Sequence, residues 1–429
     1  MITITETDIK INKSRAASRP IGEMLDKLTE NAVMFAMPGH KGGYPRDITE
    51  IDGADNLLAP SGCIEASERE AALRNGASRA FYSTNGSTAC VNAMISSLGR
   101  GAKVIAARDM HMSAVNALEM NGDRAVLVGT ADAKTPPRAD DICAAIDENG
   151  DAAAVFVTSP NYYGKVQDMA KIAQKCRERS MLLLVDGAHG AHLPFSPLLP
   201  PSPGEAGADI WCASYHKTLP ALNQAAVLFC GKNADAERLQ RCLARVHTTS
   251  PSYPIMESIE AAGDYMERCG EERLAALKKL TDGFLGALPR GIAADATDDF
   301  TRIVLDTGGR GVSGFEAEAR LAAQKVFIEA ADERRIILIC SVADKEESFE
   351  RLKSALESLP VAAPIGENAV YPLLGGTADY GSAEQGCFKK SVFAYPPGVP
   401  VLLKCTKICA EVYEEVAQMQ NKGYNLLEW

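Results

Sequence analysis

Short apolar runs alternate with amphipathic stretches between residues 64 and 230, and this alternation constrains the fold more than any other feature. Stretches such as Asp168–Arg179 carry apolar residues at helical spacing. Near-continuous apolar strands separated by helices predict a mostly parallel sheet that is covered on both faces. Ligand sites in such sheets gather at the carboxyl ends of the strands. The candidate strands are Lys103–Ala107, Ala125–Gly129, Ala153–Ser159, Met181–Asp186, Ala208–Cys212 and Ala225–Cys230.

The chain of 429 residues is long enough for a second domain. A Pro-rich loop at 194–203 precedes a long helical region over 255–288, after which the pattern of strands and helices restarts. We therefore expect an N-terminal arm over 1–60, a large domain over 61–285 and a small α+β domain over 286–429. The elements predicted in the small domain are strands Thr301–Leu305 and Arg335–Cys340 and helices Gly314–Lys325, Lys345–Leu359 and Ile408–Asn421.

Composition argues against several classes of function. The formal net charge of −11 and the lack of any Lys/Arg block disfavour a nucleic-acid partner. No apolar stretch is long enough for a signal peptide or a membrane span. The 12 cysteines form no C-x-x-C pair, and the 6 histidines form no ligand cluster. We expect a reduced, cytoplasmic protein without a metal ion and without a membrane partner.

A lysine lies between the last two apolar runs, in the segment Ala213–Gln224. Lysine is uncommon between buried strands because an unpaired buried ammonium is costly. A partly desolvated lysine has a lowered pKa, and its neutral amine can form a Schiff base. Taken alone, the segment fits an ordinary loop lysine equally well, so Lys217 needs support from the rest of the chain.

Three further segments also follow apolar runs or open helices. The turn Ser83–Thr88 opens a helical stretch, where free backbone N–H groups and hydroxyls can bind phosphate; an ordinary helix cap is the alternative. Asp186 follows a buried strand and is either a turn cap or a functional carboxylate. His111 follows another strand and is either a loop histidine or a ring that stacks on a planar ligand. One cofactor uses the lysine, the phosphate turn and the acid together, namely pyridoxal 5'-phosphate.

Five motifs in order along the chain resemble the Orn/Lys/Arg decarboxylase family, in a short form without the N-terminal wing domain. The resemblance implies the aspartate aminotransferase-like fold type I, with a mostly parallel seven-stranded sheet in the large domain. It also implies pyridoxal phosphate as cofactor, an amino acid as substrate, and a homodimer or higher homo-oligomer. The motifs are Pro38–Gly43 (PGHKGG), Thr84–Thr88 (TNGST), Asp186–His192 (DGAHGAH), Ser214–Gln224 (SYHKTLPALNQ) and Tyr395–Pro400 (YPPGVP).

The resemblance assigns roles to individual residues. Lys217 would bind the cofactor covalently, and Asp186 would pair with the pyridinium nitrogen. Ala188 would pack beneath the ring, and His111 would stack on its other face. A polar side chain within 158–164 would meet the phenolic oxygen. The cofactor-binding set is Asn85, Gly86, Ser87, Thr88, His111, Asp186, Ala188, His189, Ser214, His216 and Lys217, with Ser87, Thr88, Ser214 and His216 on the phosphate; the catalytic set is Lys217, Asp186, His111 and His216.

The implied activity is decarboxylation of arginine, lysine or ornithine, which releases carbon dioxide and a polyamine-type amine. Lys217, His111 or His216 would return a proton to the α-carbon. A distal ammonium or guanidinium needs a carboxylate partner. The candidates for that partner are Glu329, Asp332, Asp379 and Glu384, each of which is otherwise a solvated surface acid.

Several positions depart from the family pattern. Met112 replaces the lysine of His-Lys-Ser, Asn223 replaces a threonine, and Phe300 replaces the proline of Asp-Pro-Thr-[Lys/Arg]. The stretches 374–380 and 404–406 also differ from the family motifs around YPPG. These departures leave two alternatives open. One is an aminotransferase or lyase that acts on an atypical amino acid, and the other is a catalytically silent homologue.

Overall fold

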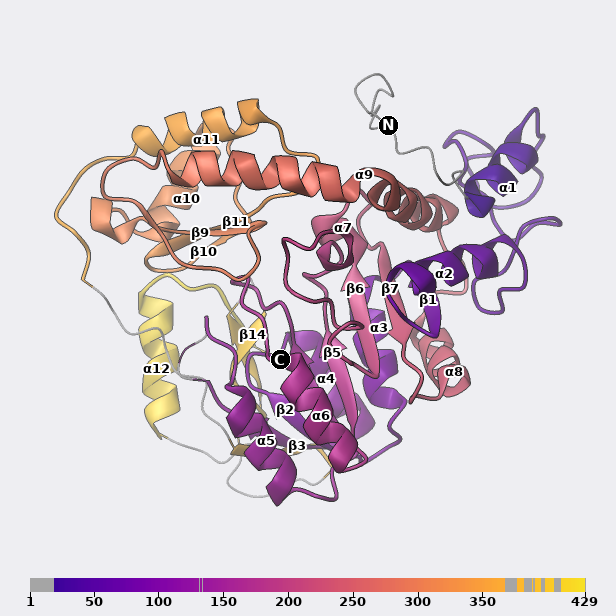
Figure 1. The fold of residues 1–429 in the computed structure, drawn as a ribbon, viewed down its shortest axis with the longest axis horizontal. Helices are drawn as coiled ribbons and strands as arrows, with labels where there is room; N and C mark the ends of the chain where they lie inside the picture. Colours follow the sequence, from indigo (N-terminus) through magenta and orange to yellow (C-terminus); the bar gives the residue numbers. More distant parts are fainter. Residues whose placement is uncertain are drawn as a thin grey trace.

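The computed structural model describes residues 19–130, 132, 134–366, 376–381, 388, 390–394, 398–404 and 410–428. Within these residues the largest sheet has eight strands, in the order β1-β7-β6-β5-β4-β2-β3-β12 (Figure 1). The strands are β1 (Arg79–Ser83), β2 (Lys103–Ala107), β3 (Arg124–Val128), β4 (Ala154–Thr158), β5 (Leu182–Asp186), β6 (Ile210–Ser214), β7 (Ala226–Cys230) and β12 (Gly376–Asp379).

The sheet is mostly parallel, as predicted. Strands β3, β2, β4, β5 and β6 pair in parallel, whereas β7 pairs antiparallel with β6 and β1, and β12 pairs antiparallel with β3. All six predicted strands are present, and the range Ala208–Cys212 is displaced by two residues from β6. Seven strands come from residues 79–230. The eighth, β12, comes from the C-terminal part of the chain and was not expected.

Alternate residues of the central strands pack into two separate cores. In β4, Val155 and Val157 join one core, and Ala154 and Phe156 join the other. Because successive side chains of a strand point to opposite faces, both faces of the sheet are buried. One face carries α3 (Gly86–Ser96), α4 (Met112–Asn121) and α8 (Ala236–Val246); the other carries α2 (Cys63–Arg74), α5 (Ala139–Glu148) and α6 (Met169–Glu178).

Helix α9 (Tyr253–Leu285) crosses the top of Figure 1 and leads to a second, antiparallel sheet. Its described order is β10-β11-β9-β8. The predicted strands and helices of this region are present within a few residues. The elements are β8 (Ala293–Ala294), β9 (Arg302–Asp306), β10 (Ala330–Ala331) and β11 (Arg335–Ile339), with helices α10 (Gly314–Ala323) and α11 (Glu346–Glu357).

The remaining elements lie near the two ends of the chain. Helix α1 (Pro20–Thr29) packs on α2 and α9, and the Glu260 carboxylate of α9 accepts hydrogen bonds from the backbone of Ile21 and Gly22, both at 3.0 Å. A third sheet has the described order β14-β13-β15. It consists of β13 (Val392–Ala394), β14 (Val399–Leu402) and β15 (Leu426–Glu428), beside helix α12 (Ala410–Asn421). The domain boundaries stay a prediction. Among the described helices, none has the length and apolar character needed to cross a membrane.

Candidate active site

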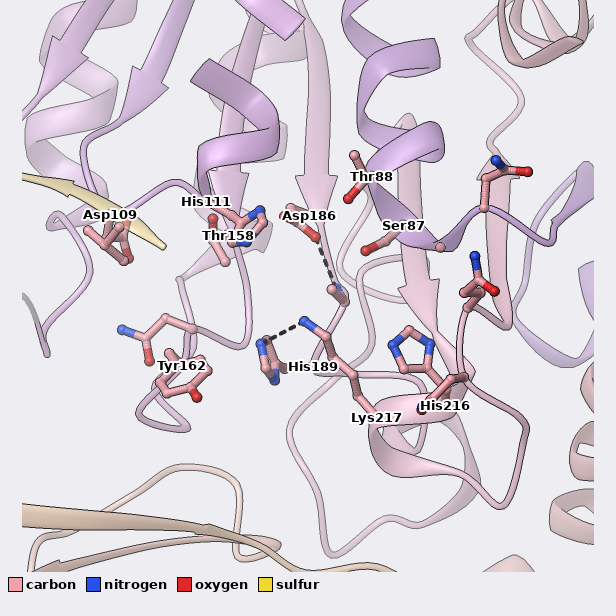
Figure 2. Close-up of a pocket in the computed structure, with 17 residues that line it drawn as sticks. Ser87, Thr88, Asp109, His111, Thr158, Tyr162, Asp186, His189, His216 and Lys217 are labelled. Atoms are coloured by element: carbon pink, nitrogen blue, oxygen red, sulfur yellow. Dashed lines mark hydrogen bonds between the residues drawn. The ribbon is translucent and has the colours of Figure 1, made fainter. Parts of the chain in front are cut away.

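A cavity of about 420 Å³ lies beyond the carboxyl ends of β2, β4 and β5. Figure 2 shows side chains from several of these strand ends and from the segment after β6 pointing into it. Ten of the eleven predicted cofactor-binding residues line it, and Ser214 is the exception. The lining residues are Asn85, Gly86, Ser87, Thr88, Asp109, His111, Thr158, Asn161, Tyr162, Asp186, Ala188, His189, His216, Lys217, Asn223, Gln224 and Val399.

Lys217 lies on α7 (Tyr215–Thr218), a single helical turn between β6 and β7. Its Nζ is 3.2 Å from Nε2 of His189 (Figure 2). Burial lowers the pKa of the Lys217 amine, although the charges of Asp186 and Glu329 act in the opposite direction. The structure therefore supplies the partly desolvated lysine that the sequence predicts.

Asp186 ends β5, and its side chain is buried at the floor of the cavity. Its Oδ1 accepts a hydrogen bond from the backbone N–H of Ala188 at 3.1 Å, and the Cys212 Sγ lies 3.5 Å away. Burial and the charge of Asp186 raise the pKa of the Cys212 thiol well above its usual value, so the thiol keeps its proton and donates to the carboxylate. Both donors orient Asp186 toward the cavity.

The first turn of α3 forms one wall of the cavity. Its N-cap, Asn85, makes no side-chain capping bond, and the N–H of Gly86 donates to the carbonyl oxygen of Gln224 at 2.9 Å, so the next N–H groups, those of Ser87 and Thr88, are the ones left for a ligand. Gly86 has a φ of +70°, a backbone conformation that favours glycine. Ser87 and Thr88 follow it and line the cavity. Ser214 does not line the cavity, and its buried hydroxyl has no hydrogen-bond partner among the described residues. This donor set suits a phosphate group.

Two other predicted histidines lie on the cavity wall. His111 caps α4, and its Nδ1 accepts a hydrogen bond from the backbone N–H of Ser113 at 3.1 Å. Burial lowers the pKa of His111 to about 4, so the ring is neutral and its proton is on Nε2. The Nδ1 of His216 is 2.9 Å from the carbonyl oxygen of Ala225, and burial lowers the pKa of His216 as well.

The motif at 186–192 contacts the segment 299–302 through polar side chains. Nη2 of Arg302 donates to Nδ1 of His189 at 2.9 Å, and Nε2 of His192 is 3.1 Å from a carboxylate oxygen of Asp299. The His192 charge and hydrogen bonds lower the pKa of Asp299 to about 2, although burial alone would raise it. The two motifs therefore meet through a pair of polar contacts, even though Phe300 replaces the family's proline.

Asp109, Tyr162, Gln224 and Val399 also line the cavity, but the sequence did not single them out. Asp109 had a usable signal, because it follows the strand Lys103–Ala107 by two residues, in the same segment as His111. Its side chain is 4% exposed, and burial raises its pKa to about 7.

Within 158–164, Asn161 stabilises the turn itself. Its Oδ1 accepts hydrogen bonds from the backbone of Tyr163 and Lys165, both at 3.0 Å. The Thr158 hydroxyl is buried and has no hydrogen-bond partner among the described residues. Thr158 is therefore the better-placed polar side chain of this segment for a ligand.

The candidate partners for a distal cation lie in different places. Glu329 accepts a hydrogen bond from the Tyr162 hydroxyl at 2.8 Å, so it lies beside the cavity. Asp332 is 3.4 Å from the hydroxyl of Tyr163. Asp379 of β12 pairs with Arg124, the first residue of β3, and so lies at the opposite end of the strands from the cavity. Glu384 lies outside the described residues.

The YPPGVP motif joins the site through its backbone, where residues 398–400 are described. The carbonyl oxygen of Gly398 accepts a hydrogen bond from the backbone N–H of Met112 at 2.8 Å. The Arg108 guanidinium donates to the carbonyl oxygens of Pro400 and Val401, the latter at 2.8 Å. The C-terminal motif is thereby fixed against the segment that carries Asp109 and His111.

Comparisons with known proteins identify the family of the chain. The chain matches "Orn/Lys/Arg decarboxylase, major domain" over residues 20–278. It is 28% identical to an arginine decarboxylase of Halalkalibacterium halodurans, over 87% of each chain. It is 27% identical to an arginine decarboxylase of Bacillus subtilis, over 86% of this chain and 87% of the relative.

Solved structures share the fold. The Francisella novicida lysine decarboxylase superposes with a TM-score of 0.75 at 17% identity, covering 96% of this chain and 79% of that one. The constitutive lysine decarboxylase of E. coli gives a TM-score of 0.74 at 15% identity, covering 96% and 80%. The match at 20–278 spans more than half of the chain, so this chain belongs to the Orn/Lys/Arg decarboxylase family of pyridoxal-phosphate-dependent enzymes with fold type I.

Proposed function

We propose that this decarboxylase acts on a basic amino acid, with arginine as the first candidate and lysine and ornithine as the others. The observation that carries the proposal is the meeting of Lys217, Asp186 and the first turn of α3 around one cavity. Relatives named arginine decarboxylase motivate the order of the candidates.

The side chains present fit the cofactor of the family. Lys217 offers a partly desolvated amine, and Asp186 offers a buried carboxylate that is held by two donors. The N–H groups of Ser87 and Thr88, their hydroxyls, and the Ser214 hydroxyl, which has no partner in the described part of the chain, would hold the phosphate. When bound, pyridoxal phosphate supplies a protonated ring that takes up the electron pair left as carbon dioxide departs.

The remaining roles concern the protein's own groups. Asp186 would keep a proton on the ring nitrogen, and the Thr158 hydroxyl would meet the phenolic oxygen. His111 and Ala188 would flank the ring. Lys217 or His216 would move the proton to the α-carbon, because both line the cavity and their pKa values are lowered by burial.

We also propose a homodimer or higher homo-oligomer. The segment 33–44 exposes large apolar side chains to solvent, among them Phe35 at 95% and Val33 at 82%. Such a patch is unusual on a monomer surface and suits contact with a second copy. Light scattering coupled to size exclusion tests this, and a monomeric mass at micromolar concentration would contradict it. The cytoplasmic location stays a prediction.

A panel of amino acids tests the substrate proposal. Release of carbon dioxide and the matching amine from arginine, lysine or ornithine supports it. A keto acid product would favour the aminotransferase alternative instead.

Borohydride reduction tests the cofactor site directly. It should fix the cofactor on the peptide that contains Lys217, and the Lys217→Ala variant is the control. Absence of the adduct in cofactor-loaded wild-type protein would favour the catalytically silent alternative.

A further inference from the structure

Arg302 is a buried cation in indirect contact with the site lysine. It begins β9, its side chain is 1% exposed, and it does not line the cavity. Its Nη2 donates to Nδ1 of His189 at 2.9 Å. The other ring nitrogen of His189 is 3.2 Å from Nζ of Lys217, as the dashed line in Figure 2 shows. Arg302, His189 and Lys217 therefore form a continuous chain of hydrogen bonds.

The direction of each bond follows from the chemistry of the three groups. A guanidinium has five N–H donors and no acceptor, so Nδ1 of His189 must accept from Arg302. A neutral imidazole carries one proton, which is then on Nε2. That N–H points at Lys217, and only a neutral amine has a lone pair to accept it.

The alternative is a charged His189, which would place an N–H of Nδ1 against the guanidinium. Burial lowers the pKa of His189 well below its usual value, and the charge of Arg302 acts in the same direction. The ring is therefore neutral, and its tautomer is set from the side of Arg302.

We propose that Arg302 is a positioning residue that fixes the tautomer of His189 and, through it, holds the Lys217 amine in its neutral, nucleophilic form. The inference rests on the role proposed for Lys217, because the nucleophilic form matters only if this amine binds the cofactor. It extends the site to a residue that touches neither the cavity nor the lysine.

The cost of burying Arg302 supports a role beyond stability. Its Nε and Nη1 have no hydrogen-bond partner among the described residues. A buried cation with unpaired donors destabilises a fold unless other contacts compensate. Asp299 provides charge compensation nearby.

The local backbone is built to admit this side chain. Gly164 has a φ of +74°, and a Cβ there would lie 2.6 Å from the Cβ of Arg302. The neighbouring Asp299 is fixed by His192 at 3.1 Å and by the Thr301 hydroxyl at 2.7 Å. These contacts fix the segment that carries Arg302, so that its guanidinium reaches His189.

Other charged groups also act on Lys217 and enter the test. Asp186 on β5 and Glu329 before β10 favour the ammonium form of Lys217, whereas burial and Arg302 favour the amine. Cys212 on β6 keeps its thiol proton and stays neutral. The neutral rings of His111 and His216 also line the cavity.

The test measures the protonation of Lys217 without substrate or cofactor. Cofactor-free protein is reductively methylated at a series of pH values, and the modified Lys217 peptide is quantified by mass spectrometry to give an apparent pKa. Arg302→Met keeps the aliphatic length and removes every donor. We expect the apparent pKa of Lys217 to rise by at least one unit, which lowers its rate of methylation roughly tenfold at a fixed pH below that pKa.

Two further variants separate the tautomer from the loss of a nearby charge. In His189→Gln the amide N–H can replace the Nε2 proton without help from Arg302. Adding Arg302→Met to that background should then change the Lys217 pKa much less than it does in wild type. Arg302→Lys restores a donor and a charge, so the apparent pKa of Lys217 should return part of the way to its wild-type value.

Nuclear magnetic resonance of protein labelled with ¹⁵N-histidine reads the tautomer itself, with His189→Gln identifying the signal. The expected result is a proton on Nε2 in wild type and a mixture of tautomers in Arg302→Met. The matched control is Arg310→Met. Arg310 is also a buried arginine, but it donates to backbone carbonyls, including that of Leu359 at 3.0 Å, and it does not line the cavity.

A proton on Nδ1 in the wild type, or an unchanged Lys217 pKa in Arg302→Met, would overturn the inference. If Arg302→Met does not fold, the tautomer measurement in wild type and the pH profiles of Arg302→Lys and His189→Gln decide it. The outcome is independent of the proposed function, because neither decarboxylation nor cofactor binding is measured. Wild-type protein that carries the His189 proton on Nε2, and whose Lys217 pKa depends on Arg302, but that binds no cofactor would refute the proposed function alone.

Discussion

Replacing Asp109 by asparagine should make the protein more stable, by an amount that grows with pH. Asp109 is a buried carboxylate with no hydrogen-bond partner for either oxygen among the described residues. Burial raises its pKa from 3.8 to about 7, which the nearby Asn161 amide and Arg108 charge offset only in part. Asparagine has nearly the same shape and no proton to lose.

The sign and size follow from proton linkage. In the unfolded chain Asp109 loses its proton near pH 3.8, whereas in the folded protein it keeps the proton up to about pH 7. The folded state binds more protons between these values, so the wild type loses stability as pH rises through this window, and the loss levels off above pH 7. Each pH unit is worth about 1.36 kcal/mol, so the advantage of Asp109→Asn should grow by about 2.5 kcal/mol between pH 5 and pH 8.

The assay is urea unfolding of cofactor-free wild type and variant at pH 5, 6, 7 and 8. Other titrations cancel in the difference between the two proteins. The control is Asp52→Asn, which makes the same substitution at an exposed aspartate. A flat or falling difference for Asp109→Asn would show that Asp109 is ionised in the folded protein and would refute the reasoning.

Other changes have equally definite outcomes. Asp186→Asn removes the buried charge from the cavity floor and should lower kcat by about 10²–10³-fold, measured as amine release. Gly164→Ala introduces a Cβ at 2.6 Å from Arg302 with a φ of +74°, and should lower the free energy of unfolding by about 1–3 kcal/mol. Thermal unfolding measures this loss, and the control is Gly150→Ala, where a Cβ meets nothing within 4 Å. Phe35→Ser should weaken self-association in sedimentation, whereas unchanged self-association would remove this side chain from the proposed interface.

The central sheet could be predicted because both of its faces are buried. A strand such as β4 is buried at every position and apolar at four of its five residues, and this gives a run that is visible in the sequence. Strands β1 and β12 lie at the two edges of the described sheet, where pairing with one neighbour holds them. Their sequences, Arg79–Ser83 and Gly376–Asp379, carry no long apolar run, so no pattern marked them.

The site could be predicted in part for a related reason. Asp186 ends one strand and His111 lies four residues after the end of another, so the strand assignment places both at the correct edge of the sheet. The partner of His189 could not be predicted, because Arg302 lies 113 residues further along and the spacing carries no information about contact. Likewise, Asp109 differs from a surface aspartate only through its burial, which depends on packing across the whole domain.

The bond between Gly398 and Met112 has a consequence for the order in which the protein matures. It joins positions 286 residues apart, and Val399 beside it completes the cavity wall. During synthesis the seven strands from residues 79–230 can pair while this later segment is still on the ribosome, because domains fold as their residues emerge. Contacts of such long range form late. Cofactor binding should therefore follow folding of the sheet. A nascent chain that already contains Lys217, Asp186 and the phosphate turn does not yet have the complete cavity wall.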